Sequence, residues 1–426
     1  MLLLARNTRK KRIIIKDSKK FKKSVFILLF IIILCILIYN SKTIINLIKN
    51  NSNNVSIPVS KEDSTTLDNQ NINTKKEQKD ITFNMSVIGD IMCHNTQYTD
   101  AYNSNTDTYD FSYVFKDIKT KIKTADIAVG NLETTFAGKS VGYSSYPTFN
   151  TPESLANNLK DLGLDVLTTA NNHSLDKGYK GIESTIDYLD KADISHTGTF
   201  KSEEDQNKIL IKNVKDVKIA FLSYTYGTNG IKVPTGKDYC INLIDKELIK
   251  KQLELAKAEN PDIICVSMHW GIEYQTKQNK EQEALADFLF ENGVDIILGS
   301  HPHVLQPMEK RTITLEDGST KDGFVIYSLG NFMSGQVKEN TKNSIILDLK
   351  ITKKAQDGKI SIDSVNYTPI YMYKSTAKIK AYKILDIENS ISKYDLDQDT
   401  SIGQKTYNTL QTELTKIKNT MGEPIK

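Results

Sequence analysis

Residues 296–303 read IILGSHPH, an apolar run that ends in two histidines on either side of one proline. The same arrangement, an apolar run followed at once by a polar cluster, occurs six more times along the chain. The other runs are SVIGD (86–90), IAVGNLE (127–133), VLTTANNH (166–173), IAFLSY (219–224), IICVSMHWG (263–271) and FVIYSLGN (324–331). Every run except IAFLSY ends in residue types that bind cations. Packing alone does not explain such a repeated placement.

Helical patterns lie between these runs. Residues 151–163, TPESLANNLKDLG, predict a helix with Thr151 as its N-cap and Gly163 just past its end. Residues 277–293 predict a second, amphipathic helix that ends at Gly293. Alternating strands and helices favour an α/β fold with a mainly parallel sheet covered by helices. Residues 311–322 predict a hairpin that turns at Asp317-Gly318, and about residues 400–420 predict a further helix.

Cation-binding residue types gather at the predicted strand ends, where ligands collect in open α/β sheets. The candidate metal ligands are Asp90, Glu133, Asn172, His269, His301 and His303, while Asn331 ends the last run. Carboxylate, amide and imidazole groups suit Mn, Zn or Fe rather than a thiolate-binding ion. Two such cations about 3.5–4 Å apart need a bridging carboxylate, for which Glu133 and Asp90 are the candidates. We expect packing or surface roles for His94 and His196, and a packing role for Trp270.

The sequence of the N-terminal part of the chain predicts a membrane anchor. Residues 1–23 hold ten Lys and Arg and one Asp, and residues 24–39 are an uninterrupted apolar run. This pattern predicts a basic cytoplasmic segment (1–23), a single transmembrane helix (24–40) and a polar, disordered linker (41–80). A cleaved signal peptide and a buried helix are the alternatives. With the anchor in the cell membrane, the rest of the chain would be extracytoplasmic.

Charge and cysteine content narrow the class of protein. The net charge of the 426 residues is +4, and subtracting the +9 of residues 1–23 leaves −5 for the remainder. The main domain is therefore mildly acidic, and no nucleic-acid partner is expected. The four cysteines show no paired spacing, so no disulfide framework is implied.

The ordered motifs GD, GNLE, NNH, HWG, HPHV and SLGNF resemble those of the CapA family, the poly-γ-glutamate capsule synthesis proteins, within the calcineurin-like metallophosphoesterase superfamily. The resemblance implies a four-layer αββα sandwich with a dinuclear centre. It places the metallophosphoesterase-like domain at 81–375 and leaves 376–426 as a C-terminal helical extension.

The resemblance also implies roles for single residues. Asp90 matches the first metal ligand, Glu133 the bridging carboxylate, and Asn172 the amide ligand of the superfamily. His269, His301 and His303 match its imidazole ligands, and His173 matches its catalytic histidine, which donates a proton or contacts phosphate. Two motifs depart from the superfamily pattern. Asp90-Ile91-Met92 lacks the histidine of its opening motif, and Gly130-Asn131-Leu132-Glu133 replaces its Gly-Asp.

The motifs, the predicted anchor and the family resemblance together indicate two classes of function. The first is a membrane-anchored hydrolase of phosphoesterase type, in which water activated by two divalent cations attacks its substrate during synthesis, export or anchoring of poly-γ-glutamate. Its partners would be the cell membrane, the anionic polymer and other capsule-synthesis membrane proteins. The second is a non-catalytic module that binds the polymer through its metals or scaffolds the assembly complex.

Overall fold

The computed structural model describes residues 79–314, 318–398 and 402–426, which belong to one compact unit, Lys76–Lys426. The predicted segment 1–23, the anchor 24–40 and nearly all of the linker 41–80 lie outside the described residues. Within the described ranges, no helix has the length and apolar character needed to cross a membrane.

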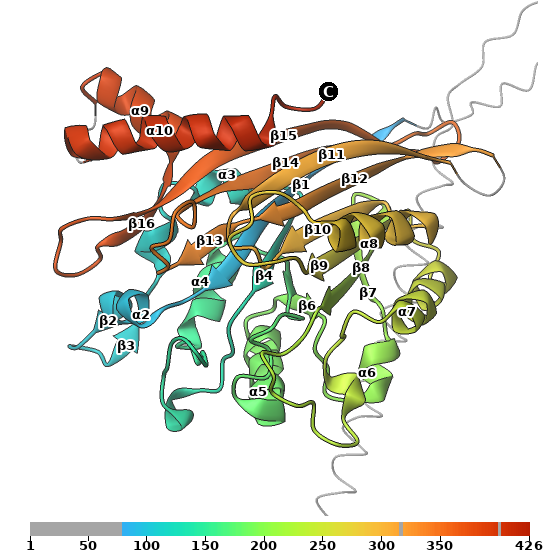
Figure 1. Ribbon diagram of the computed structural model, residues 1–426, viewed down its shortest axis with the longest axis horizontal. Coiled ribbons are helices and arrows are strands. Elements are labelled where there is room, and N and C mark those ends of the chain that lie inside the picture. The colour runs from blue at the N-terminus through green and yellow to red at the C-terminus, as the bar shows by residue number, and fades with distance from the viewer. Residues whose placement is uncertain (1–78, 315–317, 399–401) are drawn as a thin grey trace, which may run out of the picture. The chain divides into compact units, whose positions relative to one another are not determined.

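Two β-sheets form the centre of the fold (Figure 1). The larger has the order β16-β15-β14-β1-β4-β5-β6, with β13 beside β1, and the smaller has the order β11-β12-β10-β9-β8-β7. The strands of the larger sheet are β1 (Ile81–Met92), β4 (Ile127–Leu132), β5 (Val166–Thr168), β6 (Ser195–Thr197), β13 (Asn331–Ser334), β14 (Asn343–Lys353), β15 (Ile360–Lys374) and β16 (Tyr382–Asp386). Those of the smaller sheet are β7 (Leu210–Val214), β8 (Val217–Thr225), β9 (Ile263–His269), β10 (Ile296–Ser300), β11 (Leu305–Thr314) and β12 (Thr320–Leu329).

All seven apolar runs are strands, as the sequence predicted. In the larger sheet β1, β4, β5 and β6 are parallel, and antiparallel strands follow on the β14 side only. In the smaller sheet β8, β9, β10 and β12 are parallel, and one antiparallel strand lies at each edge. Central parallel strands are covered on both faces and therefore read as unbroken apolar runs. All six residues of β4 and all five of β10 are buried accordingly. The predicted hairpin is present, since β11 and β12 pair antiparallel as far as Thr314 and Thr320.

Helices pack around the two sheets. They are α2 (Asn95–Ala101), α3 (Lys119–Lys123), α4 (Ser154–Leu162), α5 (Gly178–Lys191), α6 (Glu203–Asn207), α7 (Lys246–Ala258), α8 (Lys280–Glu291), α9 (Ile387–Asp395) and α10 (Gly403–Met421). A hairpin of β2 (Tyr102–Asn103) and β3 (Thr108–Tyr109) follows α2. One apolar core lies between the sheets, a second between the large sheet and α4, and a third between the small sheet and α7 and α8. The predicted α/β sandwich is confirmed.

All three predicted helices are present, and the one at about residues 400–420 is α10, but the starts of the other two were not placed equally well. α8 begins after Asn279, which forms a capping box with Gln282, and Gly293 follows its end with a φ of 97°. α4 ends at Gly163 as predicted, but it begins at Ser154, so the prediction of Thr151 as N-cap was wrong. The Thr151 hydroxyl instead bonds the Thr134 hydroxyl at 2.7 Å, which ties the segment before the helix to the loop after β4.

The C-terminal segment 376–426 is integrated into the sandwich. Its first element, β16, pairs antiparallel with β15 at the edge of the larger sheet. Its last helix, α10, buries Leu410, Ile417 and Met421 in the core between the sheets. The predicted helical extension therefore contains two helices and also one strand of the main sheet.

A close approach of two backbones at Gly89 holds β1 against the turn between β12 and β13. A Cβ at position 89 would lie 2.0 Å from the carbonyl oxygen of Gly330. We expect Gly89→Ala to lower the free energy of unfolding by about 3 kcal/mol, the upper end for an overpacked site, because the atoms that the new Cβ would meet all belong to the backbone. Chemical denaturation measures this change in the free energy of unfolding. Gly227→Ala is the matched control, since a Cβ there meets nothing within 4 Å, and an equal loss in both variants would contradict the argument.

Candidate metal centre

The parallel strands of both sheets deliver the predicted site residues to one place. Asp90 lies in β1, Glu133 directly follows β4, and Asn172 and His173 follow β5. From the other sheet, His269 ends β9, while His301 and His303 follow β10. All seven side chains are at most 4% exposed. The structure thus brings together residues that are more than 200 positions apart in the chain.

Asp90 is directed into the site by an irregularity in β1. The register of β1 against β4 shifts between Ile88 and Asp90, and such a bulge re-aims the side chain that follows it. The Asp90 carboxylate accepts from Asn131 Nδ2 at 2.9 Å and lies 3.2 Å from His303 Nδ1. Asp90 Oδ2 also accepts from the backbone N–H of His301 at 3.4 Å.

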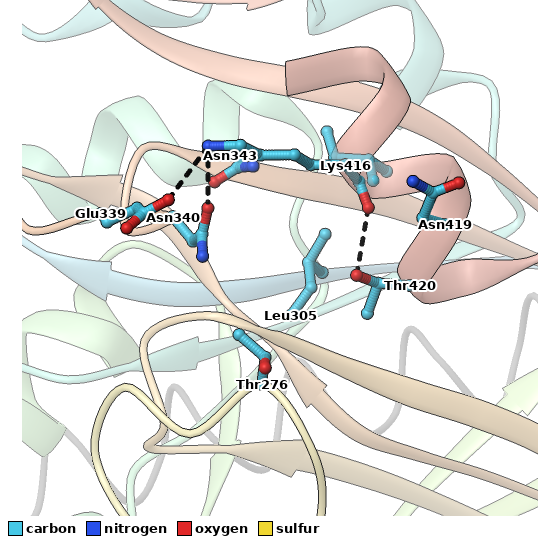
Figure 2. A pocket seen from close by; sticks show the side chains of 9 residues that line it. Thr276, Leu305, Glu339, Asn340, Asn343, Lys416, Asn419 and Thr420 are labelled. Atoms are coloured by element: carbon cyan, nitrogen blue, oxygen red, sulfur yellow. Dashed lines mark hydrogen bonds and ion pairs between the residues drawn. The ribbon is translucent and has the colours of Figure 1, made fainter. Parts of the chain in front are cut away.

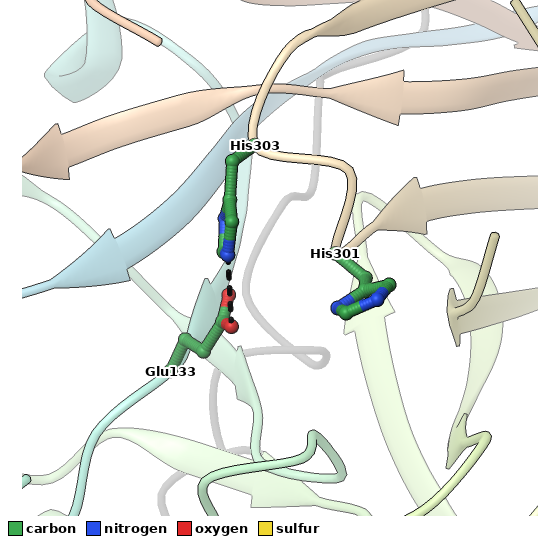
Figure 3. A group of neighbouring side chains, drawn as sticks. All are labelled: Glu133, His301 and His303. Atoms are coloured by element: carbon green, nitrogen blue, oxygen red, sulfur yellow. Dashed lines mark ion pairs between the residues drawn. The ribbon is translucent and has the colours of Figure 1, made fainter. Parts of the chain in front are cut away.

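Glu133 lies at the middle of the cluster. Its Oε1 is 3.6 Å from His269 Nε2 and 3.7 Å from His303 Nε2. It belongs to two groups of three ligand atoms that lie within 4.8 Å of one another, one with His301 and His303, the other with Asp90 and His269. Figure 3 shows Glu133 directed at His303, with His301 on the same loop. A carboxylate shared by two groups has the position that a bridging ligand requires.

The loop with His301 and His303 has a strained backbone. The φ angles of the two histidines are 96° and 59°, a region that residues with a Cβ rarely adopt. Such conformations persist only where surrounding contacts hold them. Here the backbone N–H of Tyr274 donates to the Pro302 carbonyl at 2.8 Å, in addition to the bond from His301 to Asp90. Contacts with the surrounding fold therefore hold the backbone of both histidines in place, and this fixes the positions of the two imidazoles.

His269 and Asn172 connect the two sheets across the site. His269 Nε2 lies 2.8 Å from Asn172 Oδ1, and His269 Nδ1 lies 2.8 Å from Ser300 Oγ. With this contact the six predicted metal ligands form one continuous cluster. Their convergence, which the sequence predicted, is observed.

Burial favours the neutral forms of His269 and His301. Burial, followed by the neighbouring His301 and His303, lowers the pKa of His269 well below its usual value. Burial and His303 lower the pKa of His301 to about 3. Burial and then the charge of Asp90 raise the pKa of Glu133 well above its usual value. Unprotonated imidazoles can bind a cation, and a nearby cation would favour the ionised form of Glu133.

His173 forms a buried pair with Asp176. Its Nδ1 lies 2.8 Å from Asp176 Oδ2, which also accepts from the backbone N–H of Phe149 at 2.6 Å. The Phe149 ring contacts the His173 ring edge-on at a centroid distance of 4.8 Å. A carboxylate behind the imidazole fixes its orientation and leaves Nε2 available for other contacts.

Several residues around the centre were missed or undervalued from the sequence. Asn131, inside the GNLE motif, donates to Asp90 and, at 3.5 Å, to Glu133. Asp176 follows His173 by three residues, a spacing that could have suggested the pair. Tyr226 was not among the predicted site residues; its ring lies 4.5 Å from that of His301, and nearly half of the residue is exposed.

The other two histidines and Trp270 have the packing roles that were expected. His94 contacts the Phe149 ring edge-on at 5.2 Å, and burial, with smaller contributions from His303 and His173, lowers its pKa to about 4. It therefore lies closer to the centre than the sequence indicated. His196 bonds Asp190 at 3.1 Å, away from the cluster. Trp270 is buried and donates to the Tyr327 carbonyl at 2.9 Å.

The donor set fits a divalent metal. Among the described residues, Glu133 Oε1 and His301 Nδ1 are buried and have no hydrogen-bond partner. Buried polar atoms are nearly always satisfied, so two polar atoms without partners in one cluster call for a ligand. Carboxylate, amide oxygen and imidazole together suit borderline divalent ions.

Comparison with known proteins identifies the family. Residues 84–336, more than half of the chain, match the family described as "Bacterial capsule synthesis protein PGA_cap". The chain belongs to this capsule synthesis family.

Relatives and solved structures resemble the chain to different degrees. The PGA_cap chain is 30% identical over 287 residues to "Capsule biosynthesis protein CapA" of Bacillus anthracis, covering 64% of each protein. It is 28% identical over 304 residues to "PGA biosynthesis protein CapA" of Bacillus subtilis, covering 71% of this chain and 74% of the relative. The calcineurin-like phosphoesterase YfkN of Bacillus subtilis is 15% identical, with a TM-score of 0.40 over 78% of this chain and 99% of that one. A score this low does not establish a shared fold, so the architecture rests on the sheets and helices themselves.

Proposed function

We propose that this PGA_cap chain is a metal-dependent hydrolase that acts on poly-γ-glutamate at the cell surface. The observation that carries the proposal is the position of Glu133, a buried carboxylate shared by two ligand groups inside a capsule synthesis domain. A four-layer phosphoesterase-like sandwich with two Mn-, Zn- or Fe-type cations is part of the proposal. So is a membrane anchor at residues 24–40 that places the domain outside the cell, next to the polymer and its membrane partners.

The residues of the centre would have two kinds of role, binding the cations and contacting the substrate. Asp90, Glu133, Asn172, His269, His301 and His303 would hold the cations. When bound, the cations supply Lewis acidity and bring the pKa of water to about 7. His173 would either donate a proton to the leaving oxygen or nitrogen or contact a phosphoryl oxygen, and Asp176 keeps its ring in one orientation. Burial of the cluster excludes bulk water, which strengthens every electrostatic contact inside it.

The hydrolase proposal is tested with the full-length chain purified in detergent. After chelation and reloading with Mn²⁺, Zn²⁺ or Fe²⁺, we expect turnover of a generic phosphodiester and shortening of poly-γ-glutamate. His303→Ala should lose activity at least about 100-fold, because outer partners of metal ligands alone are worth 10–100-fold. His196→Ala, a histidine away from the centre, should match the wild type. Equal turnover by His303→Ala and the wild type would exclude catalysis by this centre.

A binding module without catalysis is the alternative, and one residue favours it. Met92 occupies the position where the superfamily motif has an imidazole, and it is only 2% exposed. A cation held with one ligand fewer could retain carboxylates of the polymer while partner proteins carry out the chemistry. Metal and polymer binding that persist with no turnover of either substrate would establish this alternative.

A further inference from the structure

A cavity of about 310 Å³ lies between helix α10 and the loops beside the metal centre. It is lined by Thr276, Leu305, Glu339, Asn340, Asn343, Lys416, Ile417, Asn419 and Thr420. Figure 2 shows α10 on one side, the Glu339–Asn340 segment on another, and Thr276 and Leu305 facing them. The residues come from four separate parts of the chain, so the cavity is a product of the tertiary fold.

The cavity is close to the metal centre along two segments of chain. Leu305 comes two residues after His303, and two residues of extended chain span at most about 7 Å. Thr276 comes two residues after Tyr274, whose ring lies 6.2 Å from that of His303. A molecule engaged at the centre and extended along this side would pass Tyr274 and reach the cavity.

The loop between β13 and β14 links the two places as well. Lys338 Nζ lies 3.7 Å from the centroid of the Tyr274 ring, directly before the cavity residues Glu339 and Asn340. Asn331, which is paired with Asp90 between β13 and β1, donates to the carbonyl of Thr341 in the same loop at 3.1 Å. The loop that forms the cavity wall is thus fastened to a strand of the metal site.

The lining of the cavity suits amide and carboxylate groups. Lys416 Nζ lies 3.1 Å from Glu413 Oε1, 3.3 Å from Asn340 Oδ1 and 3.4 Å from Glu339 Oε1, so it offsets the charge of two carboxylates beside the cavity. Asn343, which is 4% exposed, donates to Glu413 at 2.6 Å, and its Oδ1 has no hydrogen-bond partner among the described residues. Asn419 on the exposed side of α10 offers a further amide. These groups provide N–H donors for carboxylate and carbonyl oxygens together with acceptors for amide N–H.

We propose that this cavity is a distal subsite that holds γ-linked glutamyl units of a polymer engaged at the metal centre. The proposal rests on the proposed function, from which the polymer is taken. Each glutamyl unit carries one amide and one carboxylate, the two groups that the lining matches. Lys338 places positive charge along the route, and Lys416 offsets the charges of Glu339 and Glu413, in a domain whose overall charge would otherwise repel the polymer. Helix α10 thereby becomes part of substrate recognition.

The test compares γ-linked glutamate oligomers of two and of ten units on the metal-loaded full-length chain, by titration calorimetry. We expect the long oligomer to bind the wild type more tightly than the short one. Asn419→Trp fills the cavity from an exposed position and should weaken binding of the long oligomer about tenfold, the loss of one or two hydrogen bonds to charged groups, without affecting the short one. Thr415→Trp, exposed one turn earlier on α10 and outside the lining, should bind both oligomers like the wild type.

The outcomes separate this proposal from the proposed function. Equal binding of the two oligomers, no binding of either, or wild-type affinity in Asn419→Trp would overturn the distal subsite. Metal content and turnover of a small phosphodiester depend on the centre alone and should be unchanged in Asn419→Trp. These two measurements therefore test the hydrolase proposal whether or not the distal subsite exists. Lys416→Gln gives a second variant, for which weakened binding of the long oligomer is likewise expected and wild-type affinity would count against the subsite.

Discussion

Glu133→Gln should remove metal binding from the protein and at the same time make the metal-free form more stable. Glu133 contributes to both groups of ligand atoms, so its loss affects every cation position in the cluster. We expect metal content to fall below about one tenth of the wild-type value and turnover to fall at least about 1000-fold, near 4 kcal/mol of transition-state stabilisation. Elemental analysis and phosphodiester turnover measure the two losses.

The stability of the metal-free variant should change in the opposite direction. Burial and the adjacent Asp90 raise the pKa of Glu133, which shows that its charge is costly in this place. Glutamine keeps the shape and removes the charge, so we expect the free energy of unfolding to rise by about 1 kcal/mol. A variant that merely misfolds would lose stability. Glu281→Gln, exposed at the start of α8, is the control, and unchanged metal content in Glu133→Gln would refute the bridging position.

Much of the fold could be predicted because the central strands are buried on both faces. Such strands leave unbroken apolar runs, and each of the seven runs is indeed a strand. The partition of the strands into two sheets could not be read from the runs, since a central parallel strand looks alike in either sheet. Strand β16 was missed because YKILD is short and lies beside polar sequence; its place at the edge is set by pairing with β15.

The candidate ligands could be predicted for a related reason. Each is at or just after the end of a parallel strand, and parallel strands of a sheet end at the same edge. Residues whose role depends on side-chain direction could not be found in this way. Asp176 acts through a contact with His173 in an irregular turn, and Tyr226 faces His301 from beyond the end of β8. Neither position is marked by a pattern of apolar residues.

His94 illustrates the limit of motif spacing. It follows Asp90 by four residues, which excludes it from the opening motif of the superfamily. The chain nevertheless returns towards the site, where His94 packs on Phe149 and accepts from the backbone N–H of Gly335 at 3.0 Å. Phe149 is thereby held between His94 and His173. The sequence alone did not reveal this arrangement, because Phe149 lies more than 50 residues from His94.

His173→Gln should reduce turnover by an amount that depends on the leaving group. If His173 donates a proton, its loss should cost about 100- to 1000-fold with an alkyl phosphodiester, the range for a positioned general acid. With a p-nitrophenyl ester the cost should be only a few-fold, because that leaving group departs without a proton. Metal content should be unchanged, since His173 belongs to neither group of metal-ligand candidates. His196→Gln serves as the histidine control.

Asp176→Asn refines the same test. The amide can keep a contact to His173 Nδ1 but can no longer act only as an acceptor, so it admits the wrong orientation or tautomer of the ring. We expect a smaller loss than for His173→Gln, again concentrated on the poor leaving group. Equal losses on both esters in the two variants would exclude proton donation. In that case His173, held by Asp176, would act by contacting a phosphoryl oxygen. Each substitution would then weaken binding of the ground state and of the transition state by the same amount.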